Sequence, residues 1–188
     1  MSHVAAAFID GGYLDKVIHY DFENRRIDYG KLAQEIVQPA ELFRAYYYNC
    51  LPYQSNPPTP AESSFYAAKH RFTRALSFLP RFEVRLGRLV KRGCEADGTP
   101  IFIQKRVDCM VGVDMALLAA KGKITHVALI SGDSDLVPAV EAVKRESVLV
   151  TLWHGSYSRD TRPSRELVEI CDERREFTQE LIDRILRQ

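Results

Sequence analysis

The sequence predicts an α/β fold in which helices cover both faces of a mainly parallel sheet of about five strands. Short apolar runs recur at 4–9, 42–48, 82–87, 125–130 and 148–153, and segments with helical periodicity separate them. Strands that alternate with helices are typical of a parallel, doubly wound sheet. A length of 188 residues suits one such domain. We therefore expect a single domain over 1–188, with its core at about 4–175 and a C-terminal helix at 178–187.

The N-terminal region contains the clearest buried strand. Residues 4–9 are apolar throughout, as in a strand that is covered on both faces. We expect a short helix over 13–18 and a second helix over 29–37, which Asp28 can cap. Residues 42–48 include three consecutive tyrosines and predict the second strand.

A proline-rich loop separates this strand from a long helix. Four prolines lie within 52–60, a composition that excludes helix and interior strand. The helix predicted over 61–79 carries its apolar residues on one side. Residues 82–87 alternate as a half-buried strand does, and the segments 88–91 and 101–104 predict a hairpin around the turn between them.

The rest of the chain again alternates between helix and strand. Pro138 falls in the first turn of a helix, where proline is tolerated, with Ser134 or Asp135 as the cap of that helix. In chain order, the expected elements are a helix at 107–121, a strand at 125–130, a helix at 135–145, a strand at 148–153 and helices at 162–171 and 178–186.

The charge distribution leaves nucleic acid as a candidate partner. The net charge is +1, so no global field favours a polyanion. The middle of the chain is nevertheless basic, because ten lysines and arginines between 69 and 106 face three acids in the same stretch. Such a stretch either binds a polyanion or forms solvated helix and hairpin faces, and the sequence leaves both open.

Cysteine spacing and hydropathy predict a cytoplasmic protein without a membrane segment. The four cysteines are scattered and include no Cys-x-x-Cys pair, which argues for reduced thiols and against a structural zinc site. The sequence shows no signal peptide and no apolar run near the roughly 20 residues that a membrane helix needs.

Two of the expected strands end in acidic turns. Asp10 follows the first strand, Asp133 and Asp135 follow the fourth, and glycines and serines fill much of both turns. In open α/β sheets, ligands bind at the carboxyl ends of the strands. If these two strands are neighbours, Asp10 lies within about 5 Å, laterally, of the second turn. Taken alone, each acid is equally well explained as a turn or capping residue.

The helix predicted at 107–121 supplies a further acid. Asp108 lies at its N-terminal end, where the helix dipole favours a carboxylate by roughly 0.3–1 kcal/mol, so an ordinary N-terminal acid is the alternative explanation. Asp114 lies about 120° round the helix from Asp108, so one helix face does not present both. We rank Asp108 as a metal ligand and Asp114 as an additional acid at the edge of the site.

Converging carboxylates favour a hard divalent cation. Two carboxylates about 4 Å apart repel by roughly 4 kcal/mol at an effective dielectric of 20, so the cluster either retains a proton or binds a cation. Oxygen ligands without cysteine or histidine nearby select Mg²⁺ or Mn²⁺. Mg²⁺ often shares its coordination sites with substrate phosphates. This predicts metal-dependent phosphodiester hydrolysis, with catalytic acids at Asp10, Asp108, Asp133 and Asp135.

Basic and small residues near the acids are candidates for substrate contacts. Lys105 and Arg106 directly precede the helix that carries Asp108, and Arg159, Arg162 and Arg165 follow the last expected strand. Each of these side chains is as well explained as solvent-exposed charge. The small residues of the acidic turns leave room for a phosphate, and we include them with Lys105, Arg106 and Arg162 as substrate-binding candidates: Gly11, Gly12, Ser131 and Ser134.

Three motifs occur in a specific order: Phe8-Ile9-Asp10-Gly11-Gly12, Lys105-x-Val107-Asp108 with Asp114 further on, and Ser131-Gly132-Asp133-Ser134-Asp135 followed by Pro138. Together they resemble the NYN domain, in its LabA-like branch, of the PIN-like nuclease superfamily. The resemblance spans about 4–175 and implies a PIN-like Rossmannoid three-layer sandwich. It also implies a metal-dependent ribonuclease in which Asp10, Asp108, Asp133 and Asp135 hold Mg²⁺ or Mn²⁺, Asp114 is an additional acid and Ser131 supports the loop.

One turn departs from the family's pattern, and two hypotheses follow. Many relatives carry Asn two residues after the glycine that follows the first aspartate, and Tyr13 stands there in this sequence. The first hypothesis is a ribonuclease that acts on RNA or on single-stranded nucleic acid generally. The second is a non-catalytic NYN-fold module that binds nucleic acid or protein in a regulatory assembly, with a homodimer or partner proteins left open. A strand-Asp phosphatase is disfavoured, because it needs an acid where Gly12 stands.

Overall fold

The structure is a computed structural model, and it describes residues 3–95, 97, 100–156, 158 and 160–187. The strands are β1 (Val4–Asp10), β2 (Glu41–Cys50), β3 (Phe82–Cys94), β4 (Pro100–Lys105), β5 (His126–Ile130), β6 (Leu149–His154) and β7 (Glu173–Glu176). The helices are α1 (Gly11–Asp21), α2 (Tyr29–Ile36), α3 (Pro60–Ser77), α4 (Val107–Ala120), the 3₁₀ helix η1 (Ser134–Leu136), α5 (Val137–Arg145), α6 (Arg165–Ile170) and α7 (Gln179–Arg184).

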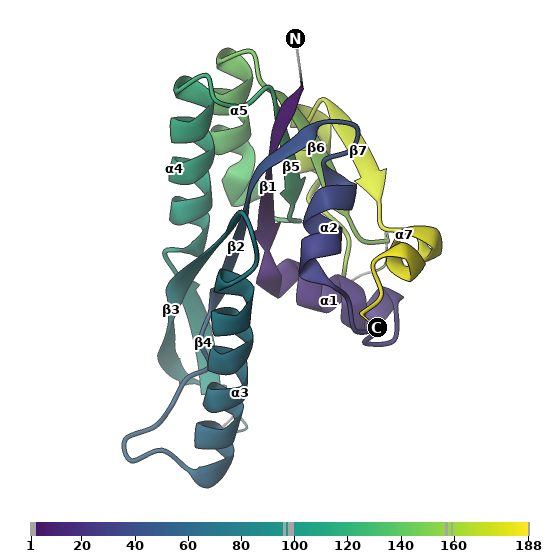
Figure 1. Cartoon of the computed structure of the whole chain (residues 1–188). Coiled ribbons are helices and arrows are strands. Elements are labelled where there is room, and N and C mark those ends of the chain that lie inside the picture. The colour runs from purple at the N-terminus through teal and green to yellow at the C-terminus, as the bar shows by residue number, and fades with distance from the viewer. Residues whose placement is uncertain (1–2, 96, 98–99, 157, 159, 188) are drawn as a thin grey trace.

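The strands form one sheet in the order β4-β3-β2-β1-β5-β6-β7 (Figure 1). Neighbouring strands are parallel, except that β3 and β4 form an antiparallel hairpin. The predicted α/β fold with a mainly parallel sheet is therefore confirmed. The prediction of about five strands was too low, because the described part of the chain forms a seven-stranded sheet.

The sheet separates two hydrophobic cores and gives the fold three layers. One core packs β1 and β2 residues against α1, α2, α3 and α7, and the other packs the opposite faces of the same strands against α4, α5 and α6. The alternation is visible along β1, where Ile9 faces the first core and Phe8 the second. Because both faces are covered, β1 is apolar at every interior position.

Several element boundaries differ from the predicted ones. β7 was missed because its sequence is charged throughout and its strand lies at the edge of the sheet, so no apolar run marks it. Helix α1 begins at Gly11 instead of Tyr13, since the Asp10 side chain accepts hydrogen bonds from the first turn. The helix expected at 162–171 is α6, which begins only after its cap, Ser164.

The register of the central strands brings the two acidic turns together. β1 lies between β2 and β5, and Ile9 pairs with Ile130. Asp10 and Ser131 therefore leave adjacent strands at the same rim, which confirms the expected neighbourhood.

Two further expectations concern the whole chain. Among the described residues, none of the helices combines the length and the apolar character that a membrane crossing requires. All four cysteines are free thiols, and only Cys171 is buried.

Candidate metal centre

The turn after β5 holds two carboxylates in fixed positions. The buried Ser131 hydroxyl accepts a hydrogen bond from the Asp133 backbone N–H at 3.2 Å. Asp133 Oδ1 in turn accepts one from the Asp135 N–H at 3.0 Å, which caps the 3₁₀ helix η1. Both side chains are exposed to solvent at the rim of the sheet. Backbone hydrogen bonds therefore hold two acids at the carboxyl end of a buried strand.

The third carboxylate comes from a different element. Asp108 lies in the first turn of α4 and is half-buried. Arg106, the residue before this helix, has a left-handed backbone conformation with φ 78°, which turns the chain sharply out of β4. This turn positions the N-terminus of α4 beside the acidic turn after β5.

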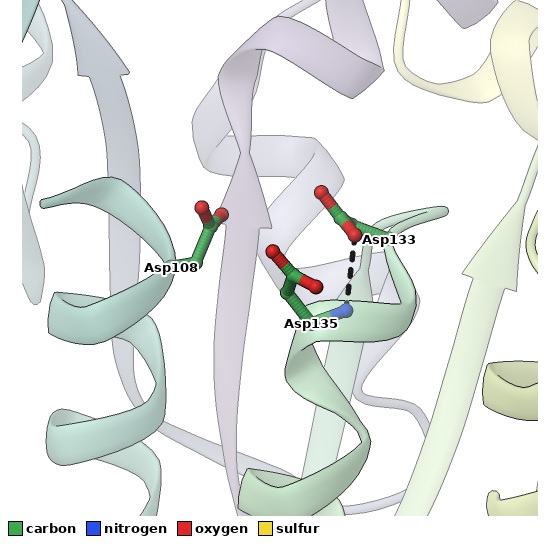
Figure 2. Close-up of side chains that lie close together, drawn as sticks. All are labelled: Asp108, Asp133 and Asp135. Atoms are coloured by element: carbon green, nitrogen blue, oxygen red, sulfur yellow. Dashed lines mark hydrogen bonds between the residues drawn. The ribbon is translucent and has the colours of Figure 1, made fainter. Parts of the chain in front are cut away.

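The three carboxylates form one cluster. One oxygen from each of Asp108, Asp133 and Asp135 lies within 4.8 Å of the others. Figure 2 shows Asp108 reaching from α4 towards the two acids of the turn. None of the three acids forms an ion pair with a lysine or arginine of the described residues. The cluster therefore concentrates negative charge without a side-chain counterion in the part of the chain that the structure describes.

Asp10 lies in the same cavity but has a different environment. Its Oδ1 accepts hydrogen bonds from the N–H groups of Gly12 at 2.9 Å and Tyr13 at 3.1 Å. Burial raises the pKa of Asp10 from 3.8 to about 6, with smaller contributions from Asp108 and Asp133, and the two backbone N–H groups oppose the rise. Asp10 is outside the 4.8 Å group in the described structure, so it borders the cluster as a helix cap.

The pKa of Asp108 is also raised. Burial raises it above its ordinary value, and the charges of Asp133 and Asp135 raise it further. A raised carboxyl pKa means that the ionised form is penalised. A cation bound among these oxygens would relieve that penalty.

The cluster faces a cavity of about 560 Å³. The sequence did not predict several of the residues that line this cavity. Of the residues predicted to contact substrate, Gly12, Ser134 and Arg162 line this cavity. Four further polar residues line it as well, and they come from α1, β4 and the segment after β6: Lys16, Gln104, Asp160 and Ser164. Their positions depend on tertiary packing, and no motif in the sequence marks them.

Tyr13 has a structural role at the position where many relatives have Asn. Its hydroxyl donates to the Thr161 carbonyl at 2.7 Å and accepts from the Gly155 N–H at 3.1 Å, which fixes the segment after β6 beside the cavity. The ring packs against Gly132, where a Cβ atom would lie 2.5 Å from the ring carbon Cε2. The Ser164 N–H also donates to the Gly132 carbonyl at 2.9 Å, so the same contacts tie this segment to the acidic turn.

Other predicted residues lie outside the cluster. Asp114 accepts a hydrogen bond from the Tyr48 hydroxyl at 2.9 Å and pairs with Arg85 at 3.2 Å, on the face of α4 that packs against the sheet. Gly11 packs against Tyr47, where a Cβ atom would lie 2.3 Å from the ring. Lys105 and Arg106 are exposed at the end of β4. Arg159 lies outside the described residues.

The residues present fit a hard divalent cation. The donor set is three carboxylates, with cysteine and histidine absent from the metal-compatible group among the described residues. Oxygen-only donors suit Mg²⁺ or Mn²⁺ more than zinc or copper. The lack of a counterion among the residues that the structure describes and the raised pKa of Asp108 both favour such a cation.

Comparison with protein families identifies the family to which this fold belongs. The model of the NYN domain matches residues 5–177, most of the chain. The chain belongs to the NYN domain family, which is part of the PIN-like nucleases. The family part of the predicted resemblance is thereby confirmed.

Individual proteins add little beyond the fold. No curated protein matches the chain significantly. A solved structure of a protein of unknown function, VPA0982 from Vibrio parahaemolyticus, shares 22% sequence identity with a TM-score of 0.59, and the match covers 99% of this chain and 97% of that one. A chitinase from Flavobacterium johnsoniae shares 8% identity over 94% of this chain and 54% of its own, and its TM-score of 0.31 carries no structural argument.

Proposed function

We propose that this protein is a metal-dependent ribonuclease of the NYN family, within its LabA-like branch, that hydrolyses RNA phosphodiester bonds. The single observation that carries the proposal is the cluster of Asp108, Asp133 and Asp135, three carboxylates from two elements with no side-chain counterion among the described residues. Membership of a nuclease family supports the reaction class.

Asp108, Asp133 and Asp135 would hold Mg²⁺ or Mn²⁺ directly, and Asp10 would complete the acidic wall of the cavity. The ion, when bound, supplies Lewis-acid activation of water and stabilises charge on the phosphate and leaving oxygen. Asp114 would remain a structural acid, because Tyr48 and Arg85 already occupy one of its oxygens.

The chain's own residues supply positioning and proton handling. Ser131 and the backbone of η1 fix the directions of the two turn carboxylates, so little reorganisation is needed when substrate arrives. Asp10, with its pKa near 6, is suited to accept or return a proton close to neutral pH. Lys16 and Arg162, which line the cavity, supply the positive charge that a phosphate requires, with Gly12 and Ser134 leaving it room.

A second candidate function is a non-catalytic NYN-fold module that binds nucleic acid or protein. Tyr13 favours this alternative, because it stands where many relatives have a polar Asn. Its hydroxyl hydrogen-bonds to the segment after β6. In that case the acidic cluster would bind a cation for structure alone.

The test is an incubation of the purified protein with labelled RNA and labelled DNA of the same sequence, with Mn²⁺ or with a chelator. We expect cleavage of RNA with Mn²⁺ and none with the chelator. Asp133→Asn should abolish cleavage while the protein remains folded by circular dichroism. If the Asp133→Asn protein cleaves as fast as the parent in Mn²⁺, the ribonuclease proposal is wrong.

Metal binding has an independent readout in thermal unfolding. A cation that binds only the folded state raises the melting temperature of the parent protein. Asp114→Asn is the matched control, since it removes one carboxylate from the same helix as Asp108 but outside the cluster. It should keep the metal-dependent rise in melting temperature that Asp108→Asn loses.

A further inference from the structure

The distal part of the β3–β4 hairpin is mostly exposed to solvent. We call residues 88–94 and 100–106 the basic arm. It projects with α3 beyond the carboxyl end of β1 (Figure 1). Leu89, Val90 and Ile103 are its only half-buried residues in the described structure, and the others are exposed. The arm therefore presents side chains to solvent on the side of the molecule where the acidic cavity opens.

The arm carries cations without acidic partners. Its basic side chains form no ion pair or side-chain hydrogen bond with any described residue: Arg88, Lys91, Arg92, Lys105 and Arg106. Of the other basic residues between 69 and 106, Lys69 pairs with Asp15, Arg81 with Glu41 and Arg85 with Asp114. Arg71 and Arg74, both on α3, form no ion pair with a described residue. Most of the positive charge of this stretch that has no acidic partner among the described residues therefore lies on the arm.

The arm is continuous with the acidic cavity. Gln104 lines the cavity, and Phe102 is two residues away on the same strand, so both side chains lie on one face of the hairpin. Lys91 pairs directly with Phe102 and shares that face. A register shift between Lys91 and Gly93 marks a bulge at Arg92, a feature that redirects a side chain. The face therefore leads from the cavity to an aromatic ring that lies directly across from Lys91, and Arg92 follows Lys91 at the bulge.

An aromatic pair lies along this face. Phe102 is 41% exposed although it is a large apolar residue, and its ring lies 5.1 Å from the ring of Tyr53. Tyr53 belongs to the proline-rich loop between β2 and α3. Phe102 is the exposed ring of the pair, and Tyr53 is half-buried. Aromatic rings beside cations are the elements with which proteins bind single-stranded nucleic acid, through base stacking and phosphate contacts.

We propose that the basic arm binds single-stranded RNA and guides it into the acidic cavity. Lys91 and Arg92 contact phosphates, Phe102 and Tyr53 stack on bases, and Gln104 lies where the strand enters the cavity. This inference rests on the proposed function for its choice of RNA as the polyanion. Without metal, the carboxylates of the cavity repel the phosphates of RNA, so we expect metal-free RNA to bind mainly to the arm.

A simpler explanation is protection of a sheet edge. β4 is the terminal strand of the sheet, and charged side chains on an edge strand prevent pairing with other chains. That explanation predicts that neutral substitutions cause aggregation and leave RNA affinity unchanged. It gives no role to the exposed Phe102 next to Tyr53, since an exposed ring promotes edge pairing.

The decisive experiment measures RNA binding without cleavage. Lys91→Gln/Arg92→Gln and Phe102→Ala are each made in an Asp133→Asn background and titrated in chelator with a single-stranded RNA of about 12 nucleotides at several salt concentrations. The double substitution should weaken binding roughly ten-fold at low salt, and the slope of log affinity against log salt should become shallower by about 1.4, for two lost phosphate contacts. Phe102→Ala should weaken binding roughly ten-fold without changing that slope.

The matched control is Lys121→Gln/Lys123→Gln, which removes the same charge from two exposed lysines between α4 and β5 that lie outside the arm and form no ion pair with a described residue. It should bind RNA nearly as the parent does. Equal losses in the control and the arm variant would overturn the inference, as would unchanged RNA affinity in the arm variant, with or without aggregation.

A further measurement distinguishes the proposal that the arm binds RNA from the proposal that the protein is a ribonuclease. With metal, an RNA too short to reach from the cavity to Phe102 should be cleaved equally by the parent and by Lys91→Gln/Arg92→Gln. If the parent cleaves no RNA but the arm variants still lose binding in chelator, the arm is correct and the ribonuclease proposal is wrong.

Discussion

The carboxyl rim of the central strands and the basic arm differ in charge and in packing. The rim is acidic and lies on strands that are buried on both faces, whereas the arm is basic and mostly exposed. At the rim, acids that form no ion pair with a described residue end β1, follow β5 and begin α4, and the interiors of both strands are almost fully buried. On the arm, cations that form no ion pair with a described residue lie on two strands that, from residue 88 on and within the described part of the chain, pair only with each other. The rim is rigid because two cores pack beneath it, while the arm has no core of its own.

This difference separates two requirements of a nuclease that acts on long RNA. Carboxylates that hold a cation must keep their positions within a fraction of an ångström, which only a packed core provides. Contacts to phosphates and bases tolerate variation, because every nucleotide offers the same charge and a flat ring face. We therefore expect changes at the rim to alter chemistry and stability, and changes on the arm to alter affinity.

The largest expected effect is on the rate of RNA cleavage, which a change at the rim should lower far more than a change on the arm. Asp135→Asn should lower RNA cleavage at least roughly 100-fold in Mn²⁺, because it removes one oxygen donor from the cluster. Lys91→Gln/Arg92→Gln should leave the rate at saturating RNA nearly unchanged and raise the RNA concentration needed for half-maximal rate. Single-turnover kinetics over a range of RNA concentrations measure both quantities. A variant of the arm that loses only maximal rate would contradict the separation.

The second prediction concerns pH and the stability of the metal-free rim. The folded protein holds a proton on Asp10 up to about pH 6, whereas the unfolded chain releases it near pH 3.8. Between these values the folded state binds more protons, so stability falls as pH rises from about 4 to about 6 and is level above that. The loss is at most roughly 3 kcal/mol. Urea unfolding in chelator measures it.

The control for this pH dependence is Asp10→Asn, which removes the titrating carboxyl. The slope should flatten but not vanish, because the pKa of Asp108 is raised as well and acts in the same direction. An unchanged slope in Asp10→Asn would show that other groups cause the pH dependence.

The third prediction tests the packing that fixes the acidic turn. Gly132→Ala places a Cβ atom against the Tyr13 ring and should destabilise the fold by roughly 1–3 kcal/mol. In a Tyr13→Ala background the collision is gone, so Gly132→Ala should then cost much less. A double-mutant cycle by chemical unfolding gives the coupling between the two residues. Additive costs would mean that the contact does not hold the turn.

The smallest expected effect is on the stability of the arm. Lys91→Gln/Arg92→Gln should change the free energy of unfolding by less than roughly 0.5 kcal/mol, because both side chains are exposed and make no ion pair with described residues. Thermal unfolding measures this change. A large destabilisation would mean that the arm contributes to the folding unit, and its effect on RNA binding would then need a different explanation.

The sequence predicted the central strands and most helices for a clear reason. Buried parallel strands are apolar at every position, and proline and capping residues mark helix ends, so β1, β5 and α3 were found with nearly correct limits. β7 was not found, because a short edge strand of charged residues has no such pattern. The same limit applies to the cavity, whose residues Lys16, Gln104 and Ser164 come from three separate elements.

The sequence by itself determined the α/β class, the parallel order of strand and helix, and the acids that end the strands, because these follow from local hydrophobic patterns and turn chemistry. Only the tertiary structure decided which acids meet. In the structure, Asp108 lies with Asp133 and Asp135 in one cluster. Asp10 caps a helix beside this cluster, and Asp114 instead contacts Tyr48 and Arg85. Side-chain direction depends on helix rotation and strand register, which are set by the packing of the two cores and not by any short stretch of the chain.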